Sequence, residues 1–507
     1  MTSPIIIRCD FFPGSGVGHL KRCNVLARAL ARFSLDSLFV LDDNCGDLPL
    51  QLSGPVALIR KFSDEHSDAS NLVELARSHG TRLVIVDSYR ISTSWLRIVS
   101  DAGLLIVAID DLGVLVGADL RIDYSAKPKH CAISHFELLG PNFFITDSPR
   151  LSPRSGPPQS MILHAGGNGD FSRAALIYEV TSNVAREKGL RITWLCTSSH
   201  SYAWLEASGF TRESDNVMGW QRQRDSLWSD YSIVVGPAST SLYEAILQGA
   251  LPISFPISQT QTSDRYGWLM LGHALHLTNI EIRDAALIND IISLALNEYS
   301  CFSKILFQYS SCLNHLGVKK VASSINDLLC GRPLKVPVRN SSLPGIRKCH
   351  IFDAEAFLNA RNSERVRALS THKEHFISWP EHILWWCKQP TTERFVLEGT
   401  SGSEVFFWHK ACRVDDCNYL IGGWFPATTN PSFDAAIRLL DWQLSYCAER
   451  YPDHLWIATI RRENRSVIML NRRYGFVDAG LRAQAAAARL FPGTNEGFVV
   501  LERKSSF

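Results

Sequence analysis

The chain has 507 residues, of which 46% are hydrophobic and 20% charged, and its formal net charge is +2. This balance gives no basic surface field for nucleic acid and no acidic tail. No apolar run approaches the roughly 18 residues that a membrane-spanning helix needs, and the N-terminal apolar segment is too short for a signal peptide. We therefore expect a cytoplasmic protein of about three domains, with no nucleic-acid partner and no insertion into membranes.

Residues 1–150 show the alternation of a first parallel α/β unit. Short apolar runs at 4–9, 37–43, 82–89 and 104–111 each end in polar residues, as strands buried on both faces of a parallel sheet do. The segment 19–33 has apolar positions at helical spacing. The pattern predicts an N-terminal Rossmann-like lobe.

The same alternation restarts near residue 160. Strands are predicted at 160–167, 191–199, 231–239 and 251–258, with helices at 172–189 and 240–250. Residues 151–330 therefore form a second Rossmann-like lobe. Ligands of such folds bind at the carboxyl ends of the strands, so we expect two lobes that face a cleft.

Residues 331–347 are predicted to be a linker, because this segment is rich in proline and poor in large apolar side chains. Residues 348–507 mix helices and strands in the order of an α+β domain around a mostly antiparallel sheet. Its tryptophans are expected in the core and on a sugar-stacking surface, and they include Trp385, Trp386, Trp424 and Trp442.

Metal and disulfide chemistry have little support in the sequence. The thirteen cysteines are scattered without a CxxC pair, so most are expected to be small core residues. Four histidines of the third domain lack compact ligand spacing, so we expect no metal; they are His350, His372, His375 and His382.

A glycine-rich turn, "GSGVGHLKR" at 14–22, follows the first predicted strand and leads into a helix. Such a turn exposes backbone N–H groups, and the helix N-terminus adds partial positive charge, which together suit a diphosphate. His19 falls in the first helical turn, where it can act as a general base or acid near neutral pH. The alternative is a helix-start histidine that is hydrogen-bonded to the backbone.

The surrounding motifs resemble the UDP-sugar hydrolase family of the pseudaminic acid pathway, a relative of the GT-B glycosyltransferases. The N-terminal signature is carried by Arg8, Asp10, Gly16, Gly18, His19, Arg22, Leu26 and Ala27. Further matches in chain order are Asp87, Tyr89, Trp95, Asp110, Asp111, Gly140, Pro141 and Asn142. The resemblance spans about the first 320 residues of the sequence.

This resemblance implies that water displaces UDP from a 2,4-diacetamido-2,4,6-trideoxy sugar, with His19 as the catalytic residue and no cofactor. Tyr89 is implied to contact the sugar or the water; its alternative is a half-buried aromatic. The implied substrate-binding residues of the first lobe are Asp10, Gly16, Gly18, Arg22, Asp87 and Asn142.

In the second lobe, "LHAGGNGD" is similar to the family's glycine turn, and "VVGPASTSLYEAILQGALP" to its nucleotide-binding segment. The resemblance implies substrate binding by Gly166, Gly167, Ser239, Thr240, Ser241, Glu244 and Gln261. Here Gln261 stands without the asparagine that usually precedes it in the family. The serine-threonine run has a plain N-cap as its alternative, and Glu244 a carboxylate favoured by the helix dipole.

Residues 348–505 resemble the GNAT N-acyltransferases. The late motif of that family is carried by Asn464, Gly475 and Phe476, and acetyl-CoA is the candidate co-substrate. Candidate acyl-CoA contacts are Asn464, Asn471, which stands where the family often has tyrosine, and Tyr474. The sequence departs from the family's pyrophosphate loop: no glycine follows Gly423 before the long helix, where Pro431 and Phe433 stand instead.

Together the resemblances predict a two-part enzyme of nonulosonic acid biosynthesis. The lobe pair hydrolyses a UDP-linked diacetamido sugar, and the last domain N-acetylates the 4-amino group of the preceding UDP-amino sugar. Association with other enzymes of the pathway is expected. The alternative is a GT-B glycosyltransferase that uses a UDP-amino sugar, with a C-terminal domain that only binds or oligomerises.

Overall fold

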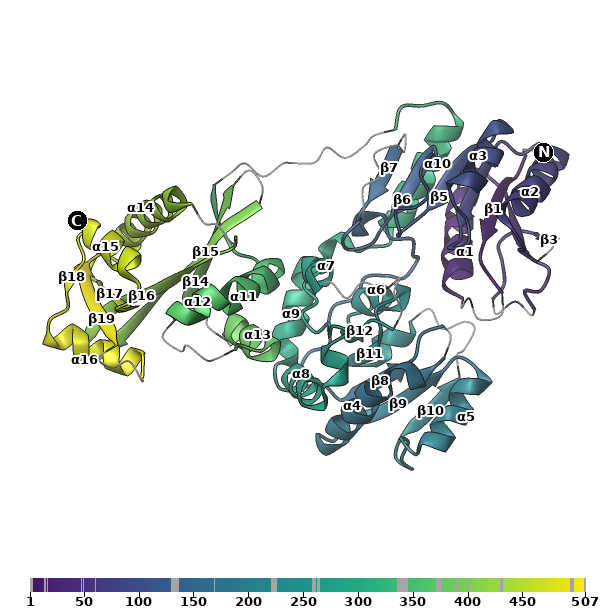
Figure 1. Ribbon diagram of the computed structural model, residues 1–507. Coiled ribbons are helices and arrows are strands. Elements are labelled where there is room, and N and C mark those ends of the chain that lie inside the picture. The colour runs from purple at the N-terminus through teal and green to yellow at the C-terminus, as the bar shows by residue number, and fades with distance from the viewer. Residues whose placement is uncertain are drawn as a thin grey trace. The chain divides into compact units, whose positions relative to one another are not determined.

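The computed structural model describes residues 3–505, apart from 13–14, 16, 47, 49, 60, 129–135, 168, 220–225, 258–260, 262–264, 335–344, 371–375, 389–390, 400–401, 429–431 and 493–496. The chain divides into two compact units, Met1–Arg339 and Asn340–Phe507 (Figure 1). Most of the predicted linker, together with His372, His375 and Pro431, lies outside the described residues.

The first unit opens with a parallel sheet in the order β3-β2-β1-β4-β5-β6-β7. Its strands are β1 (Ile5–Cys9), β2 (Ser37–Asp42), β3 (Val56–Ile59), β4 (Leu83–Asp87), β5 (Leu105–Ile109), β6 (Leu120–Asp123) and β7 (Phe136–Leu139). The intervening helices are α1 (Gly18–Ala31), α2 (Glu65–His79) and α3 (Thr93–Asp101), and a 3-10 turn η1 (Pro141–Phe143) follows β7. All residues of β1, β2 and β4 are buried, which explains their continuous apolar runs.

The second sheet of this unit is also fully parallel, in the order β10-β9-β8-β11-β12. Its strands are β8 (Ser160–His164), β9 (Arg191–Cys196), β10 (Asn216–Gly219), β11 (Ile233–Pro237) and β12 (Leu251–Phe255). Its helical elements are η2 (Phe171–Ala174), α4 (Ala175–Glu187), α5 (Ser199–Ser208), η3 (Leu227–Asp230), α6 (Thr240–Leu247), α7 (Arg265–Met270), η4 (Glu281–Arg283), α8 (Ala285–Asn297), α9 (Tyr299–Tyr309), η5 (Ser310–Cys312) and α10 (Leu316–Leu329). The two predicted Rossmann-like lobes are thus confirmed.

The last helix of the first unit joins the two lobes. Although α10 follows the second lobe in sequence, it packs against α1 and η1 of the first lobe (Figure 1). A side chain at Gly317 would collide with the backbone oxygen of Phe144, 2.4 Å away, so this glycine permits the close approach. A helix from beyond the predicted boundary near residue 150 is therefore packed on the first lobe.

The second unit is built on a mixed sheet in the order β13-β14-β15-β16-β17-β19-β18. Its strands are β13 (Ile346–Lys348), β14 (Thr392–Gly399), β15 (Gly402–Val414), β16 (Cys417–Pro426), β17 (Leu455–Arg461), β18 (Val477–Asp478) and β19 (Phe498–Lys504). Its helical elements are η6 (Ile351–Asp353), α11 (Ala354–Asn362), α12 (Glu364–Leu369), α13 (Trp379–Lys388), α14 (Phe433–Arg450), α15 (Arg465–Arg473) and α16 (Leu481–Leu490). Among the strands that the structure describes in this unit, only β16 and β17 pair in parallel, so the predicted, mostly antiparallel α+β sheet is confirmed.

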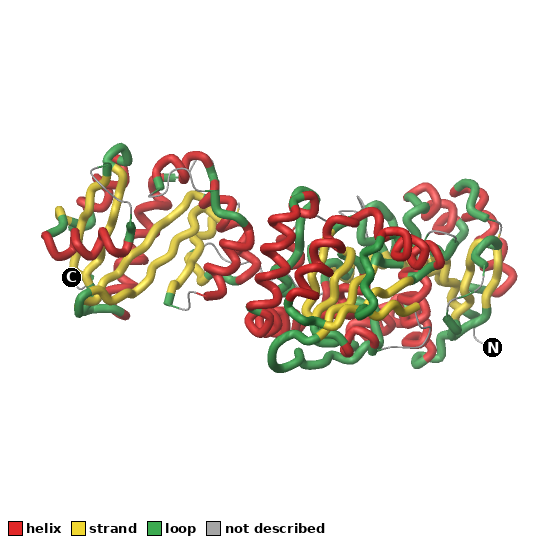
Figure 2. Tube along the Cα trace, turned by 90° about the horizontal axis from the view of Figure 1, so that it is seen from below, coloured by secondary structure: helices red, strands yellow, loops and turns green. Residues whose placement is uncertain are grey.

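Helices cover both faces of this mixed sheet (Figure 2). The core residues Phe395 and Phe407 pack with the apolar side of α14. On neighbouring positions of the same strands, Val396 and Phe406 pack with α11 and the tryptophans of α13. This alternation is the period of two that a strand buried on both faces must have.

None of the helices in the described part of the chain is both long and apolar enough to cross a membrane. Within that same part, no group of three or more His, Cys, Asp or Glu side chains is arranged to hold a metal ion.

Candidate functional site

His19 lies in the first turn of α1, which begins directly after the glycine-rich turn, and it meets the end of β4. Its Nδ1 is 2.7 Å from Oδ1 of Asp87, the last residue of β4. Asp87 comes this close because β4 runs beside β1, where Cys9 is its register partner. The pairing assigns the imidazole proton to Nδ1, which donates to the carboxylate. Nε2 of His19 has no hydrogen-bond partner among the described residues.

Asp87 is fully buried and is held by a second cation. Nε of Arg22 donates to its Oδ2 at 2.5 Å, and NH2 of the same guanidinium donates to Oδ1. Burial by itself would raise the pKa of the Asp87 carboxyl, but Arg22 and His19 outweigh it and hold that pKa well below its usual range. NH1 of Arg22 donates to the hydroxyl of Tyr124 at 2.5 Å. Asp87 and Arg22 therefore lie behind His19 and fix its orientation, rather than presenting free polar atoms of their own.

Tyr89 stands against the histidine ring. The two rings meet edge to face with centroids 4.9 Å apart, and the tyrosine is 46% exposed. Its hydroxyl donates to Oδ2 of Asp111 at 3.0 Å, while its backbone N–H donates to Oδ2 of Asp10 at 3.2 Å. Oδ1 of Asp111 is buried without a partner among the described residues. Tyr89 is thus a half-exposed side chain beside the free face of His19.

Asp10 is buried and has both carboxylate oxygens engaged. Besides Tyr89, it accepts from Arg90, whose NH2 lies 2.6 Å from Oδ1. Arg90 also bonds Asp42, and Asp42 bonds the buried Arg8 at 2.7 Å. This ion network joins the carboxyl ends of β1, β2 and β4. Asp10 is part of it and holds the backbone of Tyr89 in place.

In the second lobe, the glycine turn after β8 and the start of α6 lie at the ends of adjacent strands. Gly166 has φ +74°, the left-handed conformation that glycine adopts without strain, and Gly167 is exposed in the same turn. Ser239 holds the N-cap position of α6, but its hydroxyl bonds that of Ser241 at 2.8 Å and not a helix amide. Thr240 is the first helical residue, so Ser239 stands at the N-cap position without a side-chain cap bond.

Glu244 joins this second lobe to the helix that carries His19. Its Oε1 accepts from Nζ of Lys21 on α1 at 2.7 Å, and its Oε2 lies 3.4 Å from Nε1 of Trp228. A second link runs from the backbone N–H of Ala126 to the hydroxyl of Tyr243 at 3.0 Å. The starts of α1 and α6 are therefore tied to one another across the lobes. The alternative for Glu244, a carboxylate that is favoured by the helix dipole, does not account for its ion pair with Lys21.

Two predicted residues, Asn142 and Gln261, are not brought into this group. Asn142 is exposed on η1, where its backbone oxygen faces α10, and no described hydrogen bond joins it to the His19 group. Gln261 accepts from the backbone N–H of Ile257 at 2.7 Å, which holds its own loop. Gly18 begins α1 with no neighbouring atom within 4 Å of an added Cβ, so this position is open. Gly16 lies outside the described residues.

Several residues of the group went unassigned in the sequence. Asp111 matched the hydrolase-family motifs and Lys21 stands in the glycine-rich motif, but neither was given a role, and Arg90 and Tyr124 were not singled out. Their partners lie 22 to 223 positions away in the chain, as the pairs Tyr89–Asp111 and Lys21–Glu244 show. Only the fold brings such side chains together.

The second unit has a cavity of about 610 Å³ where two parallel strands part. β16 and β17 pair only at Tyr419 with Leu455 and at Leu420 with Trp456, and beyond these positions they diverge. The diverging segments, from Gly422 on β16 and from Ile457 on β17, line the cavity. Their backbone N–H and C=O groups on this side do not pair with each other, so they are available to a ligand.

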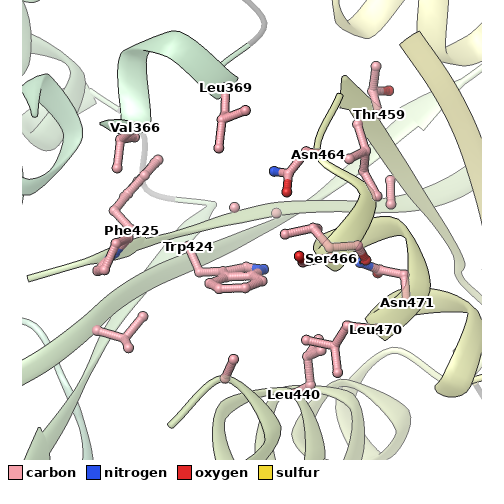
Figure 3. A pocket seen from close by; sticks show the side chains of 18 of the residues that line it. Val366, Leu369, Trp424, Phe425, Leu440, Thr459, Asn464, Ser466, Leu470 and Asn471 are labelled. Carbon is pink, nitrogen blue, oxygen red and sulfur yellow. The ribbon is translucent and has the colours of Figure 1, made fainter. Parts of the chain in front are cut away.

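Polar side chains of the lining gather on one side of the cavity. In Figure 3, Asn464, Ser466 and Asn471 lie on one side, and Val366 and Phe425 on the other. Asn464 is the N-cap of α15 and makes no side-chain cap bond. The amide of the buried Asn471 donates to the Val467 carbonyl at 2.8 Å, which fixes its orientation.

Tyr474 does not reach this cavity. Its hydroxyl donates to the backbone carbonyl of Ile437 on α14 at 3.4 Å, and its ring packs in the core below. Tyr474 is the C-cap residue that follows α15, so it stands past the end of the helix that carries Asn471. Phe433, at the start of α14, is 58% exposed and lines the cavity. The large side chain that the sequence has in place of the family's glycine loop therefore lies at the rim of the cavity.

No family model matches the sequence, and no curated protein matches it either. Among solved structures, MurG of Acinetobacter baumannii aligns at a TM-score of 0.47 and 9% identity over 64% of this chain and 99% of its own. A glycosyltransferase from Rickettsia africae aligns at 0.46 and 9% identity over 65% and 99%. The spinosyn rhamnosyltransferase SpnG aligns at 0.43 and 14% identity over 64% and 100%. Likenesses of this size carry no argument about activity, which has to come from the two sites themselves.

Proposed function

We propose that the first unit hydrolyses a UDP-linked 2,4-diacetamido-2,4,6-trideoxy sugar to the free sugar and UDP, a step of nonulosonic acid biosynthesis. The observation that supports it is the His19–Asp87 pair, which leaves Nε2 of the histidine unpartnered beside a half-exposed tyrosine. A neutral imidazole whose Nδ1–H is held by a buried carboxylate is oriented to accept a proton at Nε2. The resemblance of the surrounding motifs to the hydrolase family supplies the substrate class.

In the proposed reaction, a water oxygen attacks the anomeric carbon while His19 Nε2 takes one of its protons. The bond from that carbon to the β-phosphate oxygen breaks, and its electron pair leaves with UDP. Asp87 stabilises the imidazolium that forms, and Arg22 keeps the carboxylate ionised. Tyr89 and the unpartnered Oδ1 of Asp111 are placed to contact the sugar.

The second lobe would hold the UDP moiety. The exposed Gly167 and the uncapped start of α6 offer backbone N–H groups to the diphosphate, whereas the N–H of Gly166 donates to Nδ1 of His164 at 3.2 Å. A carboxylate can accept more hydrogen bonds than Glu244 has, so this residue could take a ribose hydroxyl without releasing Lys21. That arrangement would place the leaving diphosphate between the starts of the two helices, α1 and α6.

The test is UDP release from UDP-2,4-diacetamido-2,4,6-trideoxy-β-L-altropyranose without any acceptor. His19→Gln should lower the rate by about 10²- to 10⁴-fold, the usual contribution of a general base. The matched control is His79→Gln, an exposed histidine at the end of α2, which should leave the rate unchanged. Equal rates in the native chain and His19→Gln would contradict the proposal. Release only after an acceptor sugar is added would identify a glycosyltransferase instead.

We further propose that the second unit binds acetyl-CoA and acetylates the 4-amino group of a UDP-amino sugar. The observation that supports it is the divergence of β16 and β17, whose unpaired edges can hydrogen-bond the amides of an extended acyl-CoA chain. The volume of the cavity, about 610 Å³, suits a small-molecule site. The amine nitrogen would attack the thioester carbonyl, giving the amide and free CoA thiol with loss of the amine proton.

Cavity filling tests this second activity. Ser466→Trp adds an indole to an exposed residue that lines the cavity, and it should abolish acetyl-CoA binding measured by calorimetry. Met469→Trp, on the same helix but 71% exposed and away from the cavity, should bind as the native chain does. If the native chain binds no acetyl-CoA, the domain serves only binding or association.

A further inference from the structure

A group of aromatic and cationic side chains lies in the second unit on the face of the sheet covered by α11 and α13. The guanidinium carbon of Arg394, on β14, is 4.2 Å from the ring centre of Trp385 and 4.9 Å from that of Trp386. The guanidinium carbon of Arg361, on α11, is 5.3 Å from the ring centre of Trp385. Both tryptophans are half-buried. We call these four residues the Trp385 cluster.

In the described part of the chain, no carboxylate bonds either arginine of the cluster. Among the described residues, Arg361 makes no hydrogen bond, and Arg394 donates only to the backbone oxygens of Thr392 and Trp385, at 3.3 and 3.2 Å. Nε of Arg394 is buried and unpartnered. By contrast, Arg347 of the same unit is paired with both Asp353 and Glu398.

The electrostatic consequence is positive charge that no hydrogen-bonded carboxylate of the described residues neutralises. Burial lowers the pKa of Arg394 to about 10, and burial likewise lowers that of Arg361, which Glu381 offsets only in part. Two half-buried cations without a hydrogen-bonded carboxylate among the described residues favour an anionic ligand. Guanidinium groups match the geometry of phosphate oxygens, and a half-exposed indole can stack on a nucleobase.

The Trp385 cluster borders the cavity through a shared side chain. Phe425 lines the cavity (Figure 3), and its ring centre is 5.9 Å from the guanidinium carbon of Arg361. The cavity is lined by Leu440 of α14 on one face of the sheet and by Val366 of α12 on the other. An acyl donor and an acceptor can therefore reach the cavity from opposite faces of the sheet. The Trp385 cluster lies on the face that carries α12.

We propose that the Trp385 cluster binds the nucleoside diphosphate of the acceptor substrate, with the two arginines on the phosphates and a tryptophan on the base. The sugar amine then extends past Phe425 toward the cavity. This inference rests on the acetyl transfer proposed above, and it assigns the nucleotide part of the acceptor to residues that no motif marked.

The experiment measures acetylation by the full chain with a UDP-linked 4-amino sugar and acetyl-CoA. Arg361→Gln and Arg394→Gln should each raise the KM for the UDP-linked amine about ten- to hundredfold, the loss expected for hydrogen bonds to a charged group. The KM for acetyl-CoA should stay unchanged, which also shows that the variants are folded. Arg413→Gln, an exposed arginine of β15 paired with Asp416, is the matched control. Unchanged KM values for the amine in both variants would overturn the inference.

If the native chain acetylates nothing, the acetyl transfer is wrong, and the cluster is then tested by binding alone. Calorimetric titration of UDP into the native chain should show a class of sites that is lost in the Arg361→Gln/Arg394→Gln double variant. Identical isotherms for the two proteins would overturn the nucleotide site itself.

Discussion

Replacing Asp87 by asparagine tests the central ion pair of the first unit. The native carboxylate is fully buried and accepts from Nδ1 of His19 at 2.7 Å and from Nε of Arg22 at 2.5 Å. Asparagine keeps the shape but leaves the Arg22 guanidinium buried without its counterion. Removing one partner of a buried pair costs about 3–5 kcal/mol. Because Arg22 retains the hydroxyl of Tyr124 at 2.5 Å, we expect the lower end of that range, ~3 kcal/mol.

The assay is unfolding in urea at pH 7, with hydrogen–deuterium exchange of peptides from β1 and β4 to assign the transition to the first unit. The control is Asp147→Asn, which removes the partner of Arg28 on the same helix α1. Both side chains of that pair are about half exposed, so the change should cost less than about 1 kcal/mol. Equal stability of the two variants would refute the reasoning.

The pH dependence of the same comparison follows from the pKa of Asp87. Since the folded protein holds this pKa below its unfolded value of 3.8, the stabilisation is complete above that value and is lost as the pH falls through the folded pKa. The difference between the native chain and Asp87→Asn should therefore be constant from pH 5 to 7 and shrink only in stronger acid. A difference that shrinks near pH 6 would mean that another group carries it.

Three further predictions concern stability. Burial lowers the pKa of His164 from 6.5 to about 4, so the free energy of unfolding should fall by about 3 kcal/mol between those pH values, and His164→Asn should flatten that slope. An added Cβ at Gly236 would lie 2.2 Å from the ring of His164, so Gly236→Ala should cost about 1–3 kcal/mol by urea midpoint, whereas Gly18→Ala, with open space, should cost nothing. The Glu393 carboxylate accepts from a histidine and two tyrosines, so Glu393→Gln should destabilise by about 2 kcal/mol, and the more exposed Glu404→Gln by less than about 1, measured by thermal unfolding.

The strand and helix pattern of both units could be predicted because the order of apolar and polar residues within a segment reflects which of them are buried. All residues of β1 are buried because the strand is covered on both faces, so its sequence is apolar except for Arg8. The glycine turn that follows separates this strand from α1. The same holds for the strands around Val396 and Phe406, where alternate residues pack on opposite faces of the sheet. These patterns report the environment of each residue, not the identity of its neighbour.

The sequence by itself determined that His19 starts a helix at the carboxyl edge of a parallel sheet, because strand, turn and helix follow one another within a few residues. Tertiary structure alone decided that Nδ1 of His19 bonds Asp87 and that Nε2 has no partner among the described residues. Asp87 belongs to β4, which pairs with β1 only after the chain has formed β2 and β3. It also decided that Arg361 and Arg394 meet on Trp385, where no carboxylate of the described residues bonds either of them. The physical reason is that hydrogen bonds and ion pairs act over a few ångströms in space, whereas a sequence motif constrains only residues that are close along the chain.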